Sequence, residues 1–252
     1  MMSSLGSKYF MLVTLILFVM SGLEVYVHFL ASPKFIEYYE TQHINQTLLS
    51  GHFRDHTGSP IILNYKKQPW ISKNVHFPCA LTWVVLSPIQ FSNSLRIKYP
   101  RAHRRAGYLF LMLSLVLGIS GLLFHPAGMS ITSNSGPITI YTFLKEATTW
   151  GGPIFLFHGY KAITSARNRN FREHRRWMIR HVMAGFAVGL MRIIMFLIIF
   201  LNKLNPYGRL PAGERAYKIE TNVMWGSAWA AFVMTWIGVE VYLRYDKHVK
   251  VK

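Results

Sequence analysis

Long apolar runs alternate with short polar segments along most of this chain. Six runs reach the length of about 20 residues that an α-helix needs to cross a bilayer. They cover residues 9–30, 75–94, 106–124, 138–165, 177–201 and 221–243. The pattern predicts an all-α fold: a polytopic membrane helix bundle of about six transmembrane helices, forming a single integral membrane domain over residues 1–252.

The polar segments differ in charge, within a chain that has 28 Lys and Arg against 10 Asp and Glu. Residues 95–106 hold five Lys or Arg, 166–180 hold six and 244–252 hold four, whereas 125–137 hold none. Positive residues between spans mark the cytosolic side. We therefore expect a multi-pass protein of an endomembrane or the plasma membrane, with both termini in the cytosol and no nucleic-acid partner.

The first apolar run has an alternative interpretation. Residues 9–23 follow Lys8 and contain small residues near their end, as the core of a cleaved signal peptide does. In either case the loop 31–73 is predicted to be lumenal or extracellular. That loop contains the sequon Asn45-Gln46-Thr47, a glycosylation acceptor that a lumenal loop can display. Retention and cleavage of the first helix both stay open.

Two basic segments resemble each other. "RIKYPRAHRRAG" at 96–107 aligns without gaps with "RNRNFREHRRWM" at 167–178, at an offset of 71 residues. The alignment places His103-Arg104-Arg105 on His174-Arg175-Arg176, and each copy ends one apolar run and begins the next. The second and third helices and the fourth and fifth helices are therefore predicted to be repeated hairpins.

Histidines occur at matched depths on neighbouring predicted helices. His158 and His181 lie toward the cytosolic side, and His76 and His125 toward the other side. Neutral imidazole is a common metal ligand, and histidines on facing helices can hold a haem from both sides. We expect these four residues to bind b-type haem, with His158 and His181 as direct metal ligands.

One arginine lies in the middle of an apolar run. Arg192 shares a helical face with His181 and should point into the bundle, because a charge facing lipid is costly. The candidate partners are Glu146, Glu24 and Glu240, and depth favours the first two. Glu146 and Arg192 are the predicted catalytic pair, and a structural ion pair is the alternative.

The repeated basic motifs are candidates for binding an anion. His103 and Arg104 begin one helix, and His174, Arg175 and Arg180 begin another. Clustered cations at a membrane edge attract anionic groups, although they also serve as interface anchors. We expect a small-molecule substrate or electron donor to bind here, beside the lipid bilayer. Nothing in the sequence fixes the oligomeric state.

Several enzyme classes lack their motifs. The only aspartates are Asp55 and Asp246, so no aspartate pair can hold magnesium and a diphosphate. Cys79 is the only cysteine, which excludes an intrachain disulfide. The sequence contains no P-loop, HExxH motif or dinucleotide glycine fingerprint, which argues against ATPases and metalloproteases.

Residues 76–110 and 174–193 together resemble a family of bacterial and fungal multi-pass membrane proteins of unknown function. The shared pattern is His76, then Pro88-Ile89-Gln90-Phe91, His103-Arg104, and His174 to Arg180, with a later arginine at Arg192. The outline is similar to di-haem transmembrane cytochromes and ferric reductases, which implies b-type haems between paired histidines. The chain departs from that pattern because its histidines do not form two clean pairs.

Three functions are consistent with these features. The leading one is transmembrane electron transfer through b-type haem. The alternative is a membrane-embedded isoprenoid (terpene) cyclase or isomerase with a buried glutamate as general acid. The third is a transporter or lipid-binding protein with its site between the hairpins.

Overall fold

The computed structural model of the protein describes residues 70–123, 147–204 and 214–249. Every element within these ranges is helical: a single π-turn η2 (Ser72–His76), α3 (Phe77–Phe91), α4 (Asn93–Lys98), α5 (Pro100–Leu122), α7 (Ala147–Arg167), α8 (Phe171–Leu204) and α9 (Glu214–Val249). The all-α prediction is therefore confirmed. The predicted run 9–30 and most of the loop 31–73 lie outside the described residues.

Helix boundaries differ from the apolar runs. α5 begins at Pro100 and α8 at Phe171, about two turns before the runs at 106 and 177, and α4 was not predicted. Ser92 caps α4 by accepting a hydrogen bond from Leu95 N at 3.3 Å, and Asn170 Oδ1 accepts one from Glu173 N at 3.2 Å. Caps determine where a helix begins, whereas hydropathy reports only which part contacts lipid.

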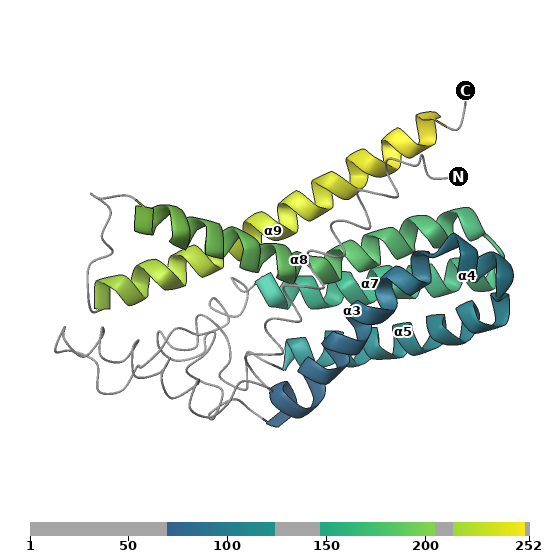
Figure 1. The fold of residues 1–252 in the computed structure, drawn as a ribbon, viewed down its shortest axis with the longest axis horizontal. Helices are drawn as coiled ribbons and strands as arrows, with labels where there is room; N and C mark the ends of the chain where they lie inside the picture. Colours follow the sequence, from purple (N-terminus) through teal and green to yellow (C-terminus); the bar gives the residue numbers. More distant parts are fainter. Residues whose placement is uncertain (1–69, 124–146, 205–213, 250–252) are drawn as a thin grey trace.

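The helices form two hairpins and one added helix (Figure 1). α3 packs against α5, and α7 packs against α8 across a tight turn in which Arg169 has φ 58°. The two hairpins pack against each other through α5 and α7. α9 packs along α8 and also contacts α7. The predicted repeated hairpins are therefore present. At the offset of 71, Phe110 of α5 corresponds to His181 of α8, and both side chains are fully buried.

Polar side chains lie inside the bundle and apolar side chains cover much of its outer surface, as contact with lipid requires. The buried polar side chains are Ser87, Ser114, Ser120, His181, Ser227 and Thr235. The exposed side of α5 is apolar and includes Tyr108, Leu109, Met112, Leu115 and Ile119. An apolar exterior around a partly polar interior is typical of a membrane bundle. Within the described residues, α5 and the segment Gly226–Tyr245 of α9 are long and apolar enough to cross a membrane.

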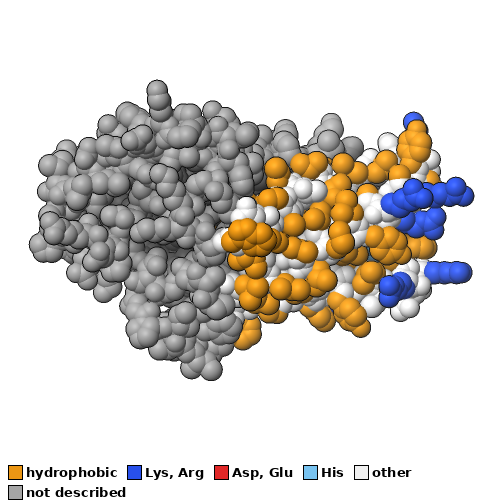
Figure 2. All heavy atoms as spheres, turned by 90° about the horizontal axis from the view of Figure 1, so that it is seen from below, with side chains coloured by type: hydrophobic (Ala, Val, Ile, Leu, Met, Phe, Trp, Pro, Cys, Tyr) orange, Lys and Arg blue, Asp and Glu red, His pale blue; other side chains and the backbone are white. Residues whose placement is uncertain are grey.

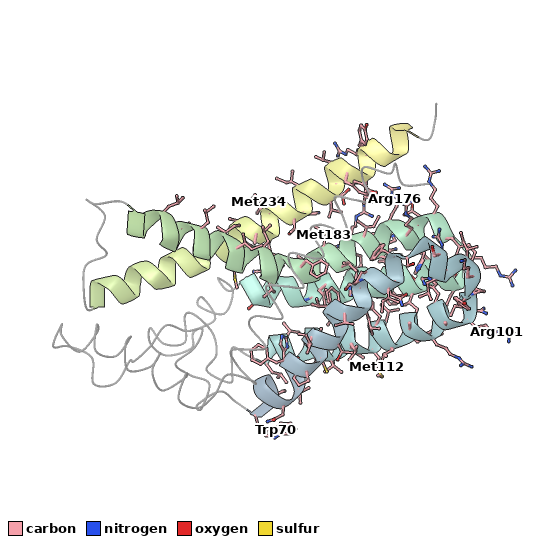
Figure 3. The ribbon with its side chains drawn as sticks, in the orientation of Figure 1. Trp70, Arg101, Met112, Arg176, Met183 and Met234 are labelled. Carbon is pink, nitrogen blue, oxygen red and sulfur yellow. The ribbon has the colours of Figure 1, made fainter. Side chains whose placement is uncertain are left out.

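Basic side chains gather at one end of the bundle (Figure 2). α4, the α7–α8 turn and the last residues of α9 lie together at this end, which we call the basic end (Figure 1). Arg101 and Arg176 point outward there, whereas Trp70 marks the opposite end of α3 (Figure 3). The ends of both hairpins therefore present their arginines on one side.

Candidate functional site

Polar pairs recur every seven residues along the interface between α3 and α5. His76 Nδ1 lies 2.8 Å from Ser120 Oγ, and Trp83 Nε1 donates to Ser114 Oγ at 2.7 Å. One heptad further, Gln90 Oε1 lies against Gly107, where an added Cβ would be only 3.3 Å away. Seven residues of helix advance about 10.5 Å, so polar side chains of this segment face α5 at three levels, and two of them have a polar partner there.

The middle level connects all four helices of the two hairpins through His181. Its Nδ1 lies 2.9 Å from the Phe155 carbonyl oxygen of α7, and its Nε2 lies 2.8 Å from Ser114 Oγ of α5. A carbonyl oxygen only accepts, so Nδ1 carries the hydrogen and Nε2 of the neutral ring is an acceptor. The single hydroxyl hydrogen of Ser114 is shared between His181 Nε2 and the Phe110 carbonyl oxygen, both at 2.8 Å. Trp83 of α3 completes the network by donating to Ser114.

The two histidines of α8 contact α7 in the same way. His174 Nδ1 lies 2.9 Å from the Ala162 carbonyl oxygen, one heptad from the equivalent bond of His181 to Phe155. Glycines allow the helices this close approach. A Cβ on Gly159 would lie 3.1 Å from His181 Cε1, and one on Gly185 would lie 2.5 Å from Trp83 Cη2. Both histidines of α8 therefore bond to the backbone of α7 through Nδ1.

This geometry does not fit the predicted haem or metal pair. Both ring nitrogens of His181 are hydrogen-bonded within the chain, and its ring stacks on Phe155 with centroids 4.1 Å apart. Iron ligation through Nε2 would break the bond to Ser114 and separate the packed helices. The ring of His158 packs on Trp177, with 5.7 Å between centroids.

At the basic end, two buried polar atoms have no hydrogen-bond partner among the described residues. These are Gln90 Nε2 near the end of α3 and His103 Nδ1 in the first turn of α5. His103 lies one turn before Gly107, the residue that Gln90 contacts, and therefore on the same side of α5. We call this pair the Gln90–His103 site. His103 also lies within electrostatic range of Arg96 and His174.

A second polar cluster lies where α7, α8 and α9 meet. Arg180 pairs with Glu240 through two bonds, Nε to Oε1 at 2.6 Å and Nη2 to Oε2 at 3.0 Å. The guanidinium lies over the Trp177 ring at 4.6 Å, and Lys161 Nζ lies 5.6 Å from the same ring. The His158 ring also belongs to this cluster and lies within hydrogen-bonding range of the Arg180 backbone.

The remaining predicted site residues are placed only in part. Arg104 is exposed at the basic end, and Arg175 is half-buried there. Arg192 belongs to α8, but its side chain is outside the described set, as are Glu146 and His125. The predicted Arg192–Glu146 and His76–His125 pairs therefore stay predictions, whereas Glu240, one candidate partner of Arg192, pairs with Arg180.

Sequence reasoning missed several residues of these clusters. Gln90 stood only in the family pattern, and Ser114, Trp83 and Trp177 were not singled out. The available signal was spacing, because His76, Trp83 and Gln90 lie seven residues apart. A polar residue repeated at that spacing in an apolar helix indicates a helix–helix contact.

Comparison with known proteins agrees with this architecture. No curated protein and no solved structure matches the chain. A family model described as "Predicted membrane protein (DUF2306)" matches residues 74–213. The match spans both hairpins, from η2 to the end of α8, and stops just before α9. The chain therefore belongs to this family of predicted membrane proteins, with the two hairpins as the shared part.

Proposed function

We propose that this protein is a multi-pass membrane protein that binds an anionic small molecule or lipid headgroup at the basic end of its bundle, on the cytosolic side. The observation that carries the proposal is the Gln90–His103 site. Its two buried nitrogens, Gln90 Nε2 and His103 Nδ1, have no partner among the described residues. This function develops the third of the sequence-based alternatives, without requiring translocation.

Unpaired buried donors imply a missing acceptor. Leaving a buried polar group unsatisfied costs about 1–3 kcal/mol, and buried polar groups in proteins almost always have a partner. A ligand rich in acceptor oxygens would satisfy the Gln90 amide and the His103 ring together.

The surrounding charge selects an anion. Arg96 and His174 lie within electrostatic range of His103. Arg101, Arg104 and Arg105 are exposed on the first turns of α5, around the same end. Such a group of cations raises the local concentration of anions, and charge-assisted hydrogen bonds are the stronger ones.

The other two functions find less support in the geometry. The haem pair predicted on the cytosolic side uses His181, and both of its ring nitrogens are bonded within the chain. The second predicted haem pair uses His125, and the cyclase uses Glu146 or another buried glutamate; His125 and Glu146 lie outside the described residues. An absorbance spectrum of the purified protein before and after dithionite tests the haem alternative. A Soret band with sharpened reduced α-bands would restore electron transfer and displace our proposal.

Binding to the protein in nanodiscs tests the proposal directly. Inorganic phosphate is titrated calorimetrically into phosphatidylcholine nanodiscs, and a second arm measures binding to phosphatidylcholine vesicles with and without phosphatidic acid. The double variant Gln90→Leu, His103→Leu should lose at least about tenfold in affinity, equal to about 1.4 kcal/mol. The control Arg105→Gln, which removes an exposed charge of the same helix, should lose far less.

The outcomes separate the possible ligands. Phosphate binding alone indicates a soluble anion, and binding only to phosphatidic acid indicates a headgroup. If neither probe binds, or if the double variant behaves like Arg105→Gln, ordered water satisfies the two nitrogens and the proposal fails. Thermal unfolding of the empty protein provides a second readout. The double variant should be at least as stable as the wild type, because leucines replace unpaired polar groups.

A further inference from the structure

Glu240 of α9 supplies a carboxylate to a site built by other helices. The pair with Arg180 is bidentate, with 2.6 and 3.0 Å between the bonded atoms. The Arg180 side chain is 13% exposed, whereas that of Glu240 is 35% exposed. The cation is therefore fixed inside the bundle surface, and the anion approaches it from the outer side.

The cluster holds more positive charge than the single carboxylate of Glu240 neutralises. Arg180 lies over the Trp177 ring, and Lys161 Nζ lies 5.6 Å from that ring, so two cations share one aromatic surface. His158 packs against the same indole and lies against the Arg180 backbone. Against two positive charges, Glu240 contributes a single negative one.

The two halves of the cluster also differ in origin. His158, Lys161, Trp177 and Arg180 lie within the residues that the family model matches, 74–213, and Glu240 lies beyond them in α9. The shared hairpins therefore supply the two cations and the aromatic ring. The carboxylate comes from the helix outside the matched region.

We infer that His158, Lys161, Trp177 and Arg180 form a second binding site, specific for a carboxylate, which Glu240 fills in this structure. We call it the Arg180 site. It shares no residue with the Gln90–His103 site and lies on different helices. The two binding proposals are therefore independent, and either can fail without the other. The ligand is a small or amphiphilic carboxylic acid that replaces the Glu240 side chain.

Geometry explains the choice of a carboxylate. A guanidinium presents Nε and one Nη as parallel donors, which match the two oxygens of a planar carboxylate. Exchange requires only that Glu240 rotate outward, because its side chain is the exposed member of the pair. α9 stays docked meanwhile, since Val239 and Leu243 pack against Ile179 in a separate apolar cluster.

The test removes the internal carboxylate and asks whether a free one binds. Sodium butyrate is titrated calorimetrically into the full-length protein in nanodiscs, as wild type and as Glu240→Gln. We expect at least tenfold tighter butyrate binding by Glu240→Gln. Glu173→Gln is the matched control, because Glu173 is as exposed as Glu240 and pairs with another arginine of α8, Arg176, at 3.0 Å, but is not a residue of the site. It should bind butyrate like the wild type.

A second readout covers a variant that folds poorly. Butyrate should raise the melting temperature of Glu240→Gln, because a ligand that binds only the folded state stabilises it. It should not raise that of the double variant Glu240→Gln, Arg180→Gln. Repeating the titration with decanoate, which partitions into the bilayer, distinguishes a membrane-borne acid from a soluble one. Equal affinities and unshifted melting in Glu240→Gln for both acids would show a structural ion pair only and overturn the inference.

Discussion

The two hairpins resemble each other in sequence and fold but treat their histidines differently. In α7–α8, His174 and His181 each donate Nδ1–H to a carbonyl oxygen of α7, one heptad apart. In α3–α5, the corresponding residues are His103 and Phe110, and His103 Nδ1 has no partner among the described residues. At this matched position, one copy of the repeat uses its histidine to hold two helices together, and the other copy leaves it without a partner among the described residues.

Helix length explains the difference. α7 continues to Arg167, well past Ala162, so a carbonyl oxygen faces His174. α3 ends at Phe91, the counterpart of Ala162 at the offset of 71, and α4 begins after the Ser92 cap. The histidine without a partner among the described residues is thus the one whose facing helix ends at the matched position.

Replacing His181 should have the largest effect on stability. His181→Ala removes the bonds to Phe155 and Ser114 and leaves a cavity beside Trp83, so we expect a loss of roughly 3 kcal/mol in unfolding free energy. Unfolding by sodium dodecyl sulfate in mixed micelles measures it. His103→Ala is the control and should lose much less. Equal losses would contradict the proposed division between the hairpins.

Filling the close approach at Gly185 should come next. This glycine is the counterpart of Ser114, and an added Cβ would lie 2.5 Å from Trp83 Cη2. Gly185→Ala should cost about 1–3 kcal/mol because the indole must move. Gly238→Ala is matched to it, since a Cβ there has nothing within 4 Å and alanine favours helix. Thermal unfolding should therefore shift in opposite directions for the two variants.

The direct comparison is between the repeated histidines themselves. His174→Leu should destabilise the protein by about 1 kcal/mol, because it removes the bond to the Ala162 carbonyl oxygen. His103→Leu should be neutral or stabilising, because it removes an unpaired buried nitrogen. Both are measured by thermal unfolding without added anion. A clear loss of stability in His103→Leu would show that this ring is structural after all.

The smallest effect is expected at the surface of the basic end. Glu173→Gln breaks the pair with Arg176, whose side chains are 33% and 35% exposed. Pairs of this exposure contribute about 0.3–0.5 kcal/mol, and less as salt rises. Thermal unfolding at low and high ionic strength should show a small difference that disappears in salt. A large, salt-independent loss would place this turn among the structural parts of the hairpin.

The sequence predicted the helices better than their contacts. Apolar runs located α3, α5, α7, α8 and α9, because burial in lipid requires that composition throughout a span. The helix ends were displaced because Ser92, Pro100 and Asn170 are cap and start signals that hydropathy does not register. The sequence also predicted that His181 points into the bundle, because it shares a helical face with Arg192.

The sequence did not predict which residues the polar side chains contact. His158 and His181 were paired by depth alone, but depth does not fix which side of a helix a residue occupies. In the fold, His158 lies toward Trp177 and Arg180, and His181 contacts Phe155 and Gly159. Likewise Arg180 and Glu240 are 60 residues apart, and their contact depends on how α9 crosses α8. Such crossings follow from packing of many side chains and not from a local pattern.

The seven-residue spacing of the α3–α5 contacts also determines alignment during assembly. Helices with a regular apolar repeat can slide past each other by one heptad and still bury similar surfaces. Here a slip in one direction would place Trp83 opposite Gly107, and a slip in the other would place it opposite Gly121, and neither glycine offers the hydroxyl that Ser114 provides. Because each level carries a different polar group, a single alignment satisfies the indole. The hydrogen bonds contribute little energy individually, yet they give the hairpin one register among several that lipid alone would tolerate.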